Sequence, residues 1–260
     1  MGNTNIISVI NQKGGVGKTT TSINLASYLA KHGKKVLLVD SDPQANATSG
    51  IGVDKTSLNL TLCEVLVSGV DMNSIIIKTN QKNLFLAPTD PKLASAEIDI
   101  ANYPNRESLL NNQINKIKSE YEVILIDCPP ALSLLTINAL CASDKVLIPV
   151  QAEYYALEGL SQLLQVMQTV QNQHNPELEI LGVLVTMYDK RNALSRQVYD
   201  EVGKHFGDKL LNTIIPRNVR LAEAPSYGQP ISEYDSWSKG AKAYKDLAKE
   251  ILAKLDGDKK

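Results

Sequence analysis

A glycine-rich turn near the N-terminus constrains this chain more than any other feature. The apolar residues 6–10 predict a buried strand, and the run Lys13-Gly14-Gly15-Val16-Gly17-Lys18-Thr19-Thr20 follows, ahead of a segment with helical character. Glycines let backbone N–H groups approach an anion closely, and the N-terminus of the following helix adds positive potential there. In such a loop the lysine, here Lys18, reaches the β- and γ-phosphates, and the adjacent hydroxyl, here Thr19, holds Mg²⁺. The sequence therefore predicts a site for a magnesium-bound nucleoside triphosphate.

The loop departs from the usual P-loop pattern at one position. That pattern has a glycine five residues before Gly17, where this chain has Gln12, and a second lysine, Lys13, follows. Residues 11–21 closely resemble the deviant P-loop of the ParA/MinD-like ATPases. The resemblance implies that Lys13 reaches across a dimer interface to the nucleotide of the partner subunit. It also implies that the nucleotide is bound by Lys13, Gly14, Gly15, Val16, Gly17, Lys18, Thr19 and Thr20.

Apolar runs alternate with helical segments along the rest of the chain. We expect strands at 6–11, 36–40, 84–88, 123–127, 145–150, 180–187 and 210–215, and helices at 18–32, 105–120, 133–142, 157–173, 194–206 and 239–255. The strand runs are rich in Val, Ile and Leu without strict alternation, which is typical of parallel strands buried on both faces. The pattern predicts an α/β fold: one doubly wound, mostly parallel, twisted sheet flanked by helices. We expect a single ATPase domain over 1–255 and a frayed tail at 256–260.

Carboxylates follow two of the predicted strands. Asp40 ends the strand at 36–40 and Asp42 follows it by two residues, and Asp127 ends the strand at 123–127, ahead of two prolines. Ligands bind at the carboxyl ends of strands in such sheets, and phosphoryl transfer depends on positioning and charge neutralisation. An aspartate at the end of an apolar strand that follows such a loop is typical of a magnesium site, so we expect Asp127 to serve the metal with Thr19. The family resemblance implies that Asp40 also lies near the metal. The family resemblance implies that Asp42 positions the attacking water.

A segment near the C-terminus carries the resemblance further. Residues 215–226 resemble the corresponding stretch of chromosomal ParA/Soj proteins, and similar stretches occur at 46–50, 135–140 and 148–160. The resemblance implies that Pro216 and Asn218 contact the adenine. It also implies a cycle in which ATP joins two subunits, the homodimer binds double-stranded DNA without sequence preference, and a ParB/Spo0J-like partner stimulates hydrolysis. Chromosome or plasmid partition, in the cytoplasm and on the nucleoid, is the implied function.

Charge gives only a weak indication of DNA binding. The net charge is −1, but the segment from 190 to 260 carries 14 basic and 10 acidic residues, which leaves 13 basic and 18 acidic residues in the remainder. By resemblance, Arg191 and Arg220 are the expected DNA contacts. Weaker candidates are Arg217, Lys239, Lys242 and Lys245.

Three other function classes use the same loop. A MinD-type division-site ATPase would need a C-terminal helix that binds membranes, whereas the predicted last helix has one apolar stripe typical of packing on its own sheet, so no stable membrane association is expected. An electron-transfer ATPase would need cysteines that hold an iron–sulfur cluster, and Cys63, Cys128 and Cys141 lack that spacing. A small-molecule kinase or synthetase would need a substrate pocket for which no motif is visible.

Overall fold

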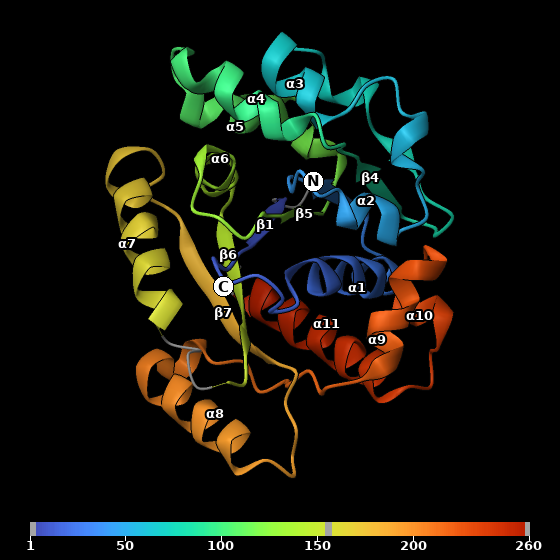
Figure 1. Ribbon diagram of the computed structural model, residues 1–260, viewed down its shortest axis with the longest axis vertical. Coiled ribbons are helices and arrows are strands. Elements are labelled where there is room, and N and C mark those ends of the chain that lie inside the picture. The colour runs from blue at the N-terminus through green and yellow to red at the C-terminus, as the bar shows by residue number, and fades with distance from the viewer. Residues whose placement is uncertain (1–3, 154–157, 258–260) are drawn as a thin grey trace.

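Seven strands form one mixed sheet in the computed structural model, which describes residues 4–153 and 158–257 (Figure 1). Their order across the sheet is β3-β4-β2-β5-β1-β6-β7, and only β3 runs antiparallel to its neighbour. The strands are β1 (Asn5–Val9), β2 (Val36–Asp40), β3 (Ile77–Lys78), β4 (Leu84–Ala87), β5 (Val123–Asp127), β6 (Lys145–Gln151) and β7 (Glu179–Thr186). The predicted doubly wound, mostly parallel sheet is confirmed.

Helices cover both faces of this sheet. One face carries α3 (Leu62–Ser68), α4 (Leu93–Asp99), α5 (Leu109–Ile117), α6 (Leu134–Ala142), α7 (Glu158–Gln173) and α8 (Ala193–Phe206). The other carries α1 (Lys18–Lys31), α2 (Asn46–Gly50), α9 (Val219–Glu223), α10 (Ile231–Tyr234) and α11 (Lys239–Gly257). In Figure 1 the blue α1 and the red α11 lie side by side near the middle, and α3, α4 and α5 lie at the top of the view.

Strand residues alternate between the two resulting cores. In β5, Ile124 and Ile126 pack with α3–α8, whereas Val123 and Leu125 pack with α1 and α11. Both sets are buried, which explains why the sequence of this strand is apolar without alternation. Asp127 follows these residues at the carboxyl end of the strand, and it is therefore held by a rigid element.

The last helix packs its apolar stripe onto α1 and the sheet. Tyr244, Leu247, Ile251 and Leu255 are all buried, and the Tyr244 hydroxyl lies 3.1 Å from the Thr21 hydroxyl. Helix α11 continues through Gly257, two residues beyond its expected end, so residues 256 and 257 are helical rather than frayed. Residues 258–260 of the expected tail lie outside the described part of the chain. Likewise, α7 begins at Glu158, and the expected helix start at Leu157 is not among the described residues.

One predicted strand is wrong. Residues 210–215 form no strand. The segment meets β7 through one isolated bridge, Leu210 with Val183, and through the Leu211 and Ile215 amides, which donate to the Val183 and Val185 carbonyls. The reason is a carboxylate from α11: Glu250 accepts hydrogen bonds from the backbone N–H groups of Asn212 and Thr213, at 2.7 and 2.8 Å. The Thr213 amide, two residues from each of these donors to β7, is therefore unavailable for a continuous ladder. The seventh strand is instead β3, a two-residue strand that the apolar pattern did not indicate.

Candidate functional site

The predicted glycine loop and carboxylates converge at the carboxyl edge of three neighbouring strands. Val9, at the end of β1, pairs in register with Asp127, and Asp127 pairs with Asp40 across β5 and β2. The glycine loop leaves β1 at this point and leads into α1, which begins at Lys18. The loop and both carboxylates therefore share the crevice in which α/β sheets bind ligands.

Hydrogen bonds fix the glycine loop at both ends. Asn11 donates to the Pro149 carbonyl at 2.8 Å and accepts from the Lys13 amide at 2.9 Å. At the other end, the Thr186 hydroxyl donates to the Val16 carbonyl at 2.8 Å. Gly17, with φ of 89°, has the left-handed conformation that glycine adopts without strain, and it turns the chain into α1. The loop is thus shaped before any ligand arrives.

Lys18 lies inside this loop. Its side chain is buried, and its Nζ donates to the Lys13 carbonyl at 3.1 Å. Burial lowers the pKa of Lys18, and the nearby Asp127 carboxylate opposes that shift. The ammonium group is therefore placed at the anion-binding turn with few competing partners.

Asp40 organises the loop that follows β2. One of its oxygens accepts from the backbone N–H and the hydroxyl of Thr48, both at 2.7 Å, and the other accepts from the Asp42 amide at 3.2 Å. Asp42 is also buried and accepts from the Gln44 amide at 3.0 Å. Burial raises the pKa of Asp40, and the hydrogen bonds from Thr48 lower it. The oxygens of Asp40 already accept three hydrogen bonds. Asp40 therefore suits a role in positioning Asp42 at the edge of a metal site.

One carboxylate oxygen of Asp127 makes no hydrogen bond within the described part of the chain. Its Oδ1 accepts from the Ser22 hydroxyl at 2.7 Å, whereas the buried Oδ2 has no hydrogen-bond partner in the described part of the chain. Burial raises the pKa of Asp127, the Asp40 charge raises it further, and the Ser22 and Thr19 hydroxyls oppose the rise. A buried oxygen without a donor is costly unless a cation or water faces it. A carboxylate oxygen beside a threonine hydroxyl is a donor set that suits Mg²⁺.

The protein supplies only part of such a metal shell. The described residues hold no group of three or more His, Cys, Asp or Glu side chains that could bind a metal ion together. Mg²⁺ commonly takes one or two protein oxygens and completes its shell with water and phosphate. Thr19 and Asp127 therefore fit a metal carried by the nucleotide, and the roles of these residues stay a prediction.

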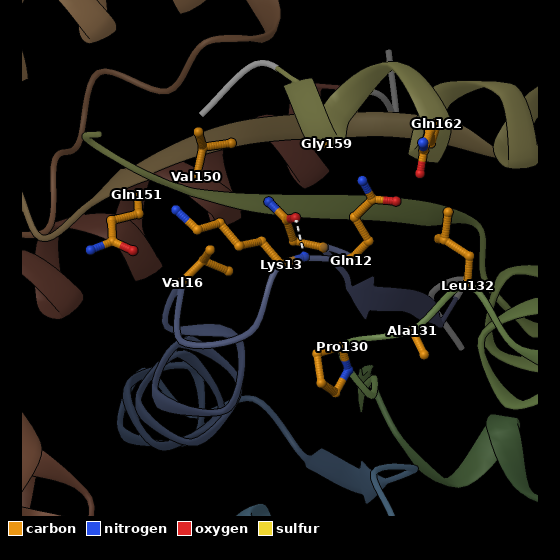
Figure 2. Close-up of a pocket in the computed structure, with 11 residues that line it drawn as sticks. Gln12, Lys13, Val16, Pro130, Ala131, Leu132, Val150, Gln151, Gly159 and Gln162 are labelled. Atoms are coloured by element: carbon orange, nitrogen blue, oxygen red, sulfur yellow. Dashed lines mark hydrogen bonds between the residues drawn. The ribbon is translucent and has the colours of Figure 1, made fainter. Parts of the chain in front are cut away.

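Lys13 forms an ion pair with a residue of the same chain. Its Nζ lies 3.3 Å from Glu153 Oε2, and Glu153 Oε1 also accepts from the Gln151 side chain at 2.5 Å. Figure 2 shows the Lys13 side chain extending towards Gln151 along the upper side of the loop. An open cavity of about 580 Å³ lies beside it, between the loop, residues 130–132 and the first turns of α7. Gln12, which replaces the usual glycine, packs against Gly159 at this cavity. A Cβ atom at position 159 would lie 2.9 Å from Gln12 Nε2, so the glycine leaves room for the side chain.

The predicted adenine and DNA residues lie on the segments that follow β7. Pro216 bridges to Tyr188, and the Asn218 side chain accepts from the Arg220 amide at 3.0 Å, which caps α9. Arg191 makes a bidentate contact with Asp189, and Arg220 pairs with Glu223 at 2.8 Å. Both guanidinium groups face solvent, and their contacts with DNA stay a prediction. The weaker candidates are exposed too: Arg217, Lys239, Lys242 and Lys245.

Three residues that support the site were missed from the sequence. Thr48 holds Asp40, Ser22 holds Asp127, and Glu153 holds Lys13. Ser22 had a usable signal, because it lies four residues after Lys18 and therefore on the same side of the first helix. Thr48 and Glu153 meet their partners only through the folded loops, so no local pattern indicated them.

Comparison with known proteins places the chain in a family. A family model described as an AAA domain matches residues 4–180. The sporulation initiation inhibitor protein Soj of Bacillus subtilis is 55% identical over 248 residues, which cover 95% of this chain and 98% of that protein. The chain belongs to the Soj/ParA family. The chromosome-partitioning ATPase Soj of Treponema pallidum is 48% identical, with 96% of this chain and 97% of that protein covered.

A solved structure supports the same fold. Cobyrinic acid a,c-diamide synthase from Mycobacterium smegmatis, with a bound ATP analogue and magnesium, has a TM-score of 0.85 and 35% sequence identity. The match covers 97% of this chain and 96% of that one. The Soj/ParA architecture is therefore shared nearly end to end with a protein whose crystals contain a nucleotide and a metal.

Proposed function

We propose that this member of the Soj/ParA family is a magnesium-dependent ATPase that partitions a chromosome or plasmid. One observation carries the ATPase part: a preformed anion-binding loop with a buried lysine adjoins a buried carboxylate, Asp127, that has an unpartnered oxygen. The names of the relatives, a chromosome-partitioning ATPase among them, support the partition part. We take residues 1–255 as one domain that acts in the cytoplasm, on the nucleoid.

The residues divide the chemistry between them. The amides of the loop and the Lys18 ammonium would bind the β- and γ-phosphates, while Thr19 and Asp127 would hold Mg²⁺. Bound Mg²⁺ would neutralise the charge on the phosphate oxygens. Asp42, fixed through Asp40, would orient the attacking water. Pro216 and Asn218 would contact the adenine.

Lys13 would complete the site of a second subunit. A cationic group supplied in trans contributes about 10³ to 10⁵ in rate in other nucleotide hydrolases. In a single subunit Lys13 is held by Glu153, at 3.3 Å, on the open side of the loop. Hydrolysis would therefore be slow until ATP joins two subunits and a ParB/Spo0J-like partner completes the stimulated state.

The ATP-bound homodimer would bind double-stranded DNA without sequence preference through Arg191 and Arg220. Two subunits double the number of phosphate contacts, which explains how ATP could control DNA binding. Each contact adds about 0.9 to the slope of log affinity against log salt.

The MinD-type alternative finds less support. The C-terminal helix that would have to bind a membrane packs its apolar stripe inside the protein, with Tyr244, Leu247 and Ile251 at most 1% exposed. Among the described helices, none combines the length and apolar character that a membrane crossing requires. Liposome co-sedimentation with ATP tests the MinD-type alternative. Pelleting of the protein with anionic vesicles would favour membrane association over DNA binding.

The decisive experiment measures retention of a duplex of random sequence with ATP, with ADP and without nucleotide, over a salt series. We expect binding with ATP alone and a steep loss with salt. Equal retention in all three nucleotide states, or none at low salt, would refute the proposed switch.

Lys13 is tested by mixing subunits. A Lys13→Ala subunit combined with a subunit that cannot hydrolyse ATP but retains Lys13 should regain phosphate release, since the intact lysine reaches across the interface. The matched control combines two subunits that both lack Lys13. No rescue in the first mixture would contradict action in trans.

A further inference from the structure

Trp237 is unusually exposed. It lies between α10 and α11, its side chain is 96% exposed, and it is the only tryptophan in the chain. An aromatic side chain buries about 150 to 250 Å² when it packs, so an indole left in water forgoes a large stabilisation. Tryptophan is also the residue type most enriched where a few side chains dominate an interface. The exposure therefore points to an intermolecular contact.

The Trp237 backbone is linked to the Arg220 guanidinium through one side chain. A single carboxylate joins them: Asp235 Oδ1 accepts from the Trp237 backbone N–H at 3.2 Å, and Asp235 Oδ2 lies 3.5 Å from Arg220 Nε. The elements that carry the two residues are also tightly packed, since a Cβ on Gly240 of α11 would lie 2.7 Å from Leu221 of α9. Trp237 and Arg220 thus lie in one region of the surface.

The charges around Trp237 favour a polyanion. Residues 217–245 carry five cations and three acids, and the cations are all exposed: Arg217, Arg220, Lys239, Lys242 and Lys245. The acids are Glu223, Glu233 and Asp235, of which Glu223 and Asp235 pair with Arg220. A membrane surface would require a continuous apolar face, and here the apolar side of α11 is buried.

We propose that Trp237 packs against the sugar–phosphate backbone of duplex DNA beside Arg220 and donates its Nε1–H to a phosphate oxygen. This inference rests on the proposed function, in which the ATP-bound dimer holds DNA. A backbone contact of this kind carries no sequence information, so it suits a protein that binds DNA without sequence preference. The indole adds apolar area to the contact, and Arg220 adds charge.

The two contributions have different salt signatures. Replacing a cation removes counterion release, so Arg220→Gln should reduce the slope of log affinity against log salt by about 1.8 for a dimer, 0.9 for each subunit. Trp237 is neutral, and Trp237→Ala should weaken binding about fivefold or more at every salt concentration with the slope unchanged. Trp237→Phe should recover part of the loss, because it keeps the ring and lacks the N–H group.

The test uses the full chain with a non-hydrolysable ATP analogue and a random-sequence duplex. Fluorescence excited at the red edge of the absorption band reports Trp237 alone, although the chain has 10 tyrosines. We expect the emission to change as DNA is added, with a midpoint that matches DNA retention by the same sample. Ile98→Ala serves as the control for truncation, since Ile98 is 75% exposed on α4, on the other face of the sheet.

The outcomes separate this inference from the proposed function. DNA retained by the wild type with no change in Trp237 emission, and retained equally by Trp237→Ala, would overturn the tryptophan contact and leave DNA binding intact. No retention by the wild type would overturn both. An emission change on addition of a ParB-type protein or anionic vesicles, with none on DNA, would overturn the assignment to DNA. Unchanged thermal unfolding of Trp237→Ala would exclude misfolding as the cause of any loss.

Discussion

The hydroxyl of Thr48 supports the loop that follows β2. The loss of folding stability on its removal can be worked out from its hydrogen bonds. The hydroxyl donates to Asp40 at 2.7 Å and accepts from the Thr89 amide at 3.1 Å, and all three residues are fully buried. Thr48→Val keeps the side-chain shape and removes both hydrogen bonds. Losing a bond to a carboxylate costs about 1.5 to 3 kcal/mol, and stranding a buried N–H group costs about 1 to 3 kcal/mol. The added methyl group returns roughly 0.8 kcal/mol.

We therefore expect the free energy of unfolding to fall by about 3 kcal/mol in Thr48→Val. At roughly 2 to 4 °C for each kcal/mol, the melting temperature should fall by about 6 to 12 °C. Thr48→Ser is the matched control, because it keeps the hydroxyl and loses only a methyl group, at roughly 1 kcal/mol. Denaturant unfolding of both variants measures the difference. Equal stability of the valine and serine variants would refute the assigned role of the hydroxyl.

The same pair of variants should show a dependence on pH. Burial raises the pKa of Asp40 to about 6, above the value of about 4 in an unfolded chain. The folded protein thus binds this proton more tightly, and the stability contributed by Asp40 falls as pH rises from about 4 to about 6. The Thr48 hydroxyl opposes the rise in pKa, so the valine variant should have a still higher pKa. The stability gap between the variants should therefore widen from about pH 5 to about pH 8, and a gap that narrows would contradict the reasoning.

Three further predictions concern the site and the DNA surface. Lys18→Ala should abolish nucleotide binding, because the buried ammonium is lost from the loop; calorimetry that shows micromolar ATP affinity would count against it. Asp42→Ala should bind ATP, hydrolyse it slowly and accumulate dimer on sizing, and a monomeric variant with full phosphate release would remove Asp42 from its role. Glu223→Gln should strengthen DNA retention about threefold at low salt, since Glu223 holds Arg220 at 2.8 Å; unchanged or weaker retention would argue that the pair orients Arg220 for DNA.

The parts of the fold that the sequence predicted are those coded by local runs. The strand at 123–127 is apolar on both faces and ends in Asp127, and the structure has the same bounds for β5. The segment at 210–215 is equally apolar, but two of its amides bond to Glu250, which lies 37 and 38 residues away in α11. A local sequence pattern does not show that a distant carboxylate competes with a neighbouring strand for backbone amides. The short α3 was not predicted, although Thr61 and Glu64 form a capping box at its start that is visible in the sequence.

The sequence indicated candidate residues that would meet a ligand, whose roles stay a prediction, and it did not indicate the residues that hold them in place. Lys18, Asp40 and Asp127 carry recognisable spacing, because the strand ends and the glycine turn impose it. Thr48 and Glu153 act through loops whose paths depend on the whole fold. The pairs of Arg191 with Asp189 and of Arg220 with Glu223 span two and three residues, so the sequence offered a local signal for them. Lys13 meets Glu153 across 140 residues, and no local pattern indicates that pair.

Those pairs share a feature that bears on how the protein could switch. Lys13 is held by Glu153, Arg191 by Asp189, and Arg220 by Glu223 and Asp235. Ion pairs on a surface contribute only about 0 to 1 kcal/mol each, so a phosphate group can displace these carboxylates at little cost. A single phosphate contact gains little over the acid it replaces, however, and the gain grows only when several contacts form together. A lone subunit offers few such contacts and a dimer twice as many. Binding that depends on subunit number is therefore the expected behaviour of cations that begin in internal pairs.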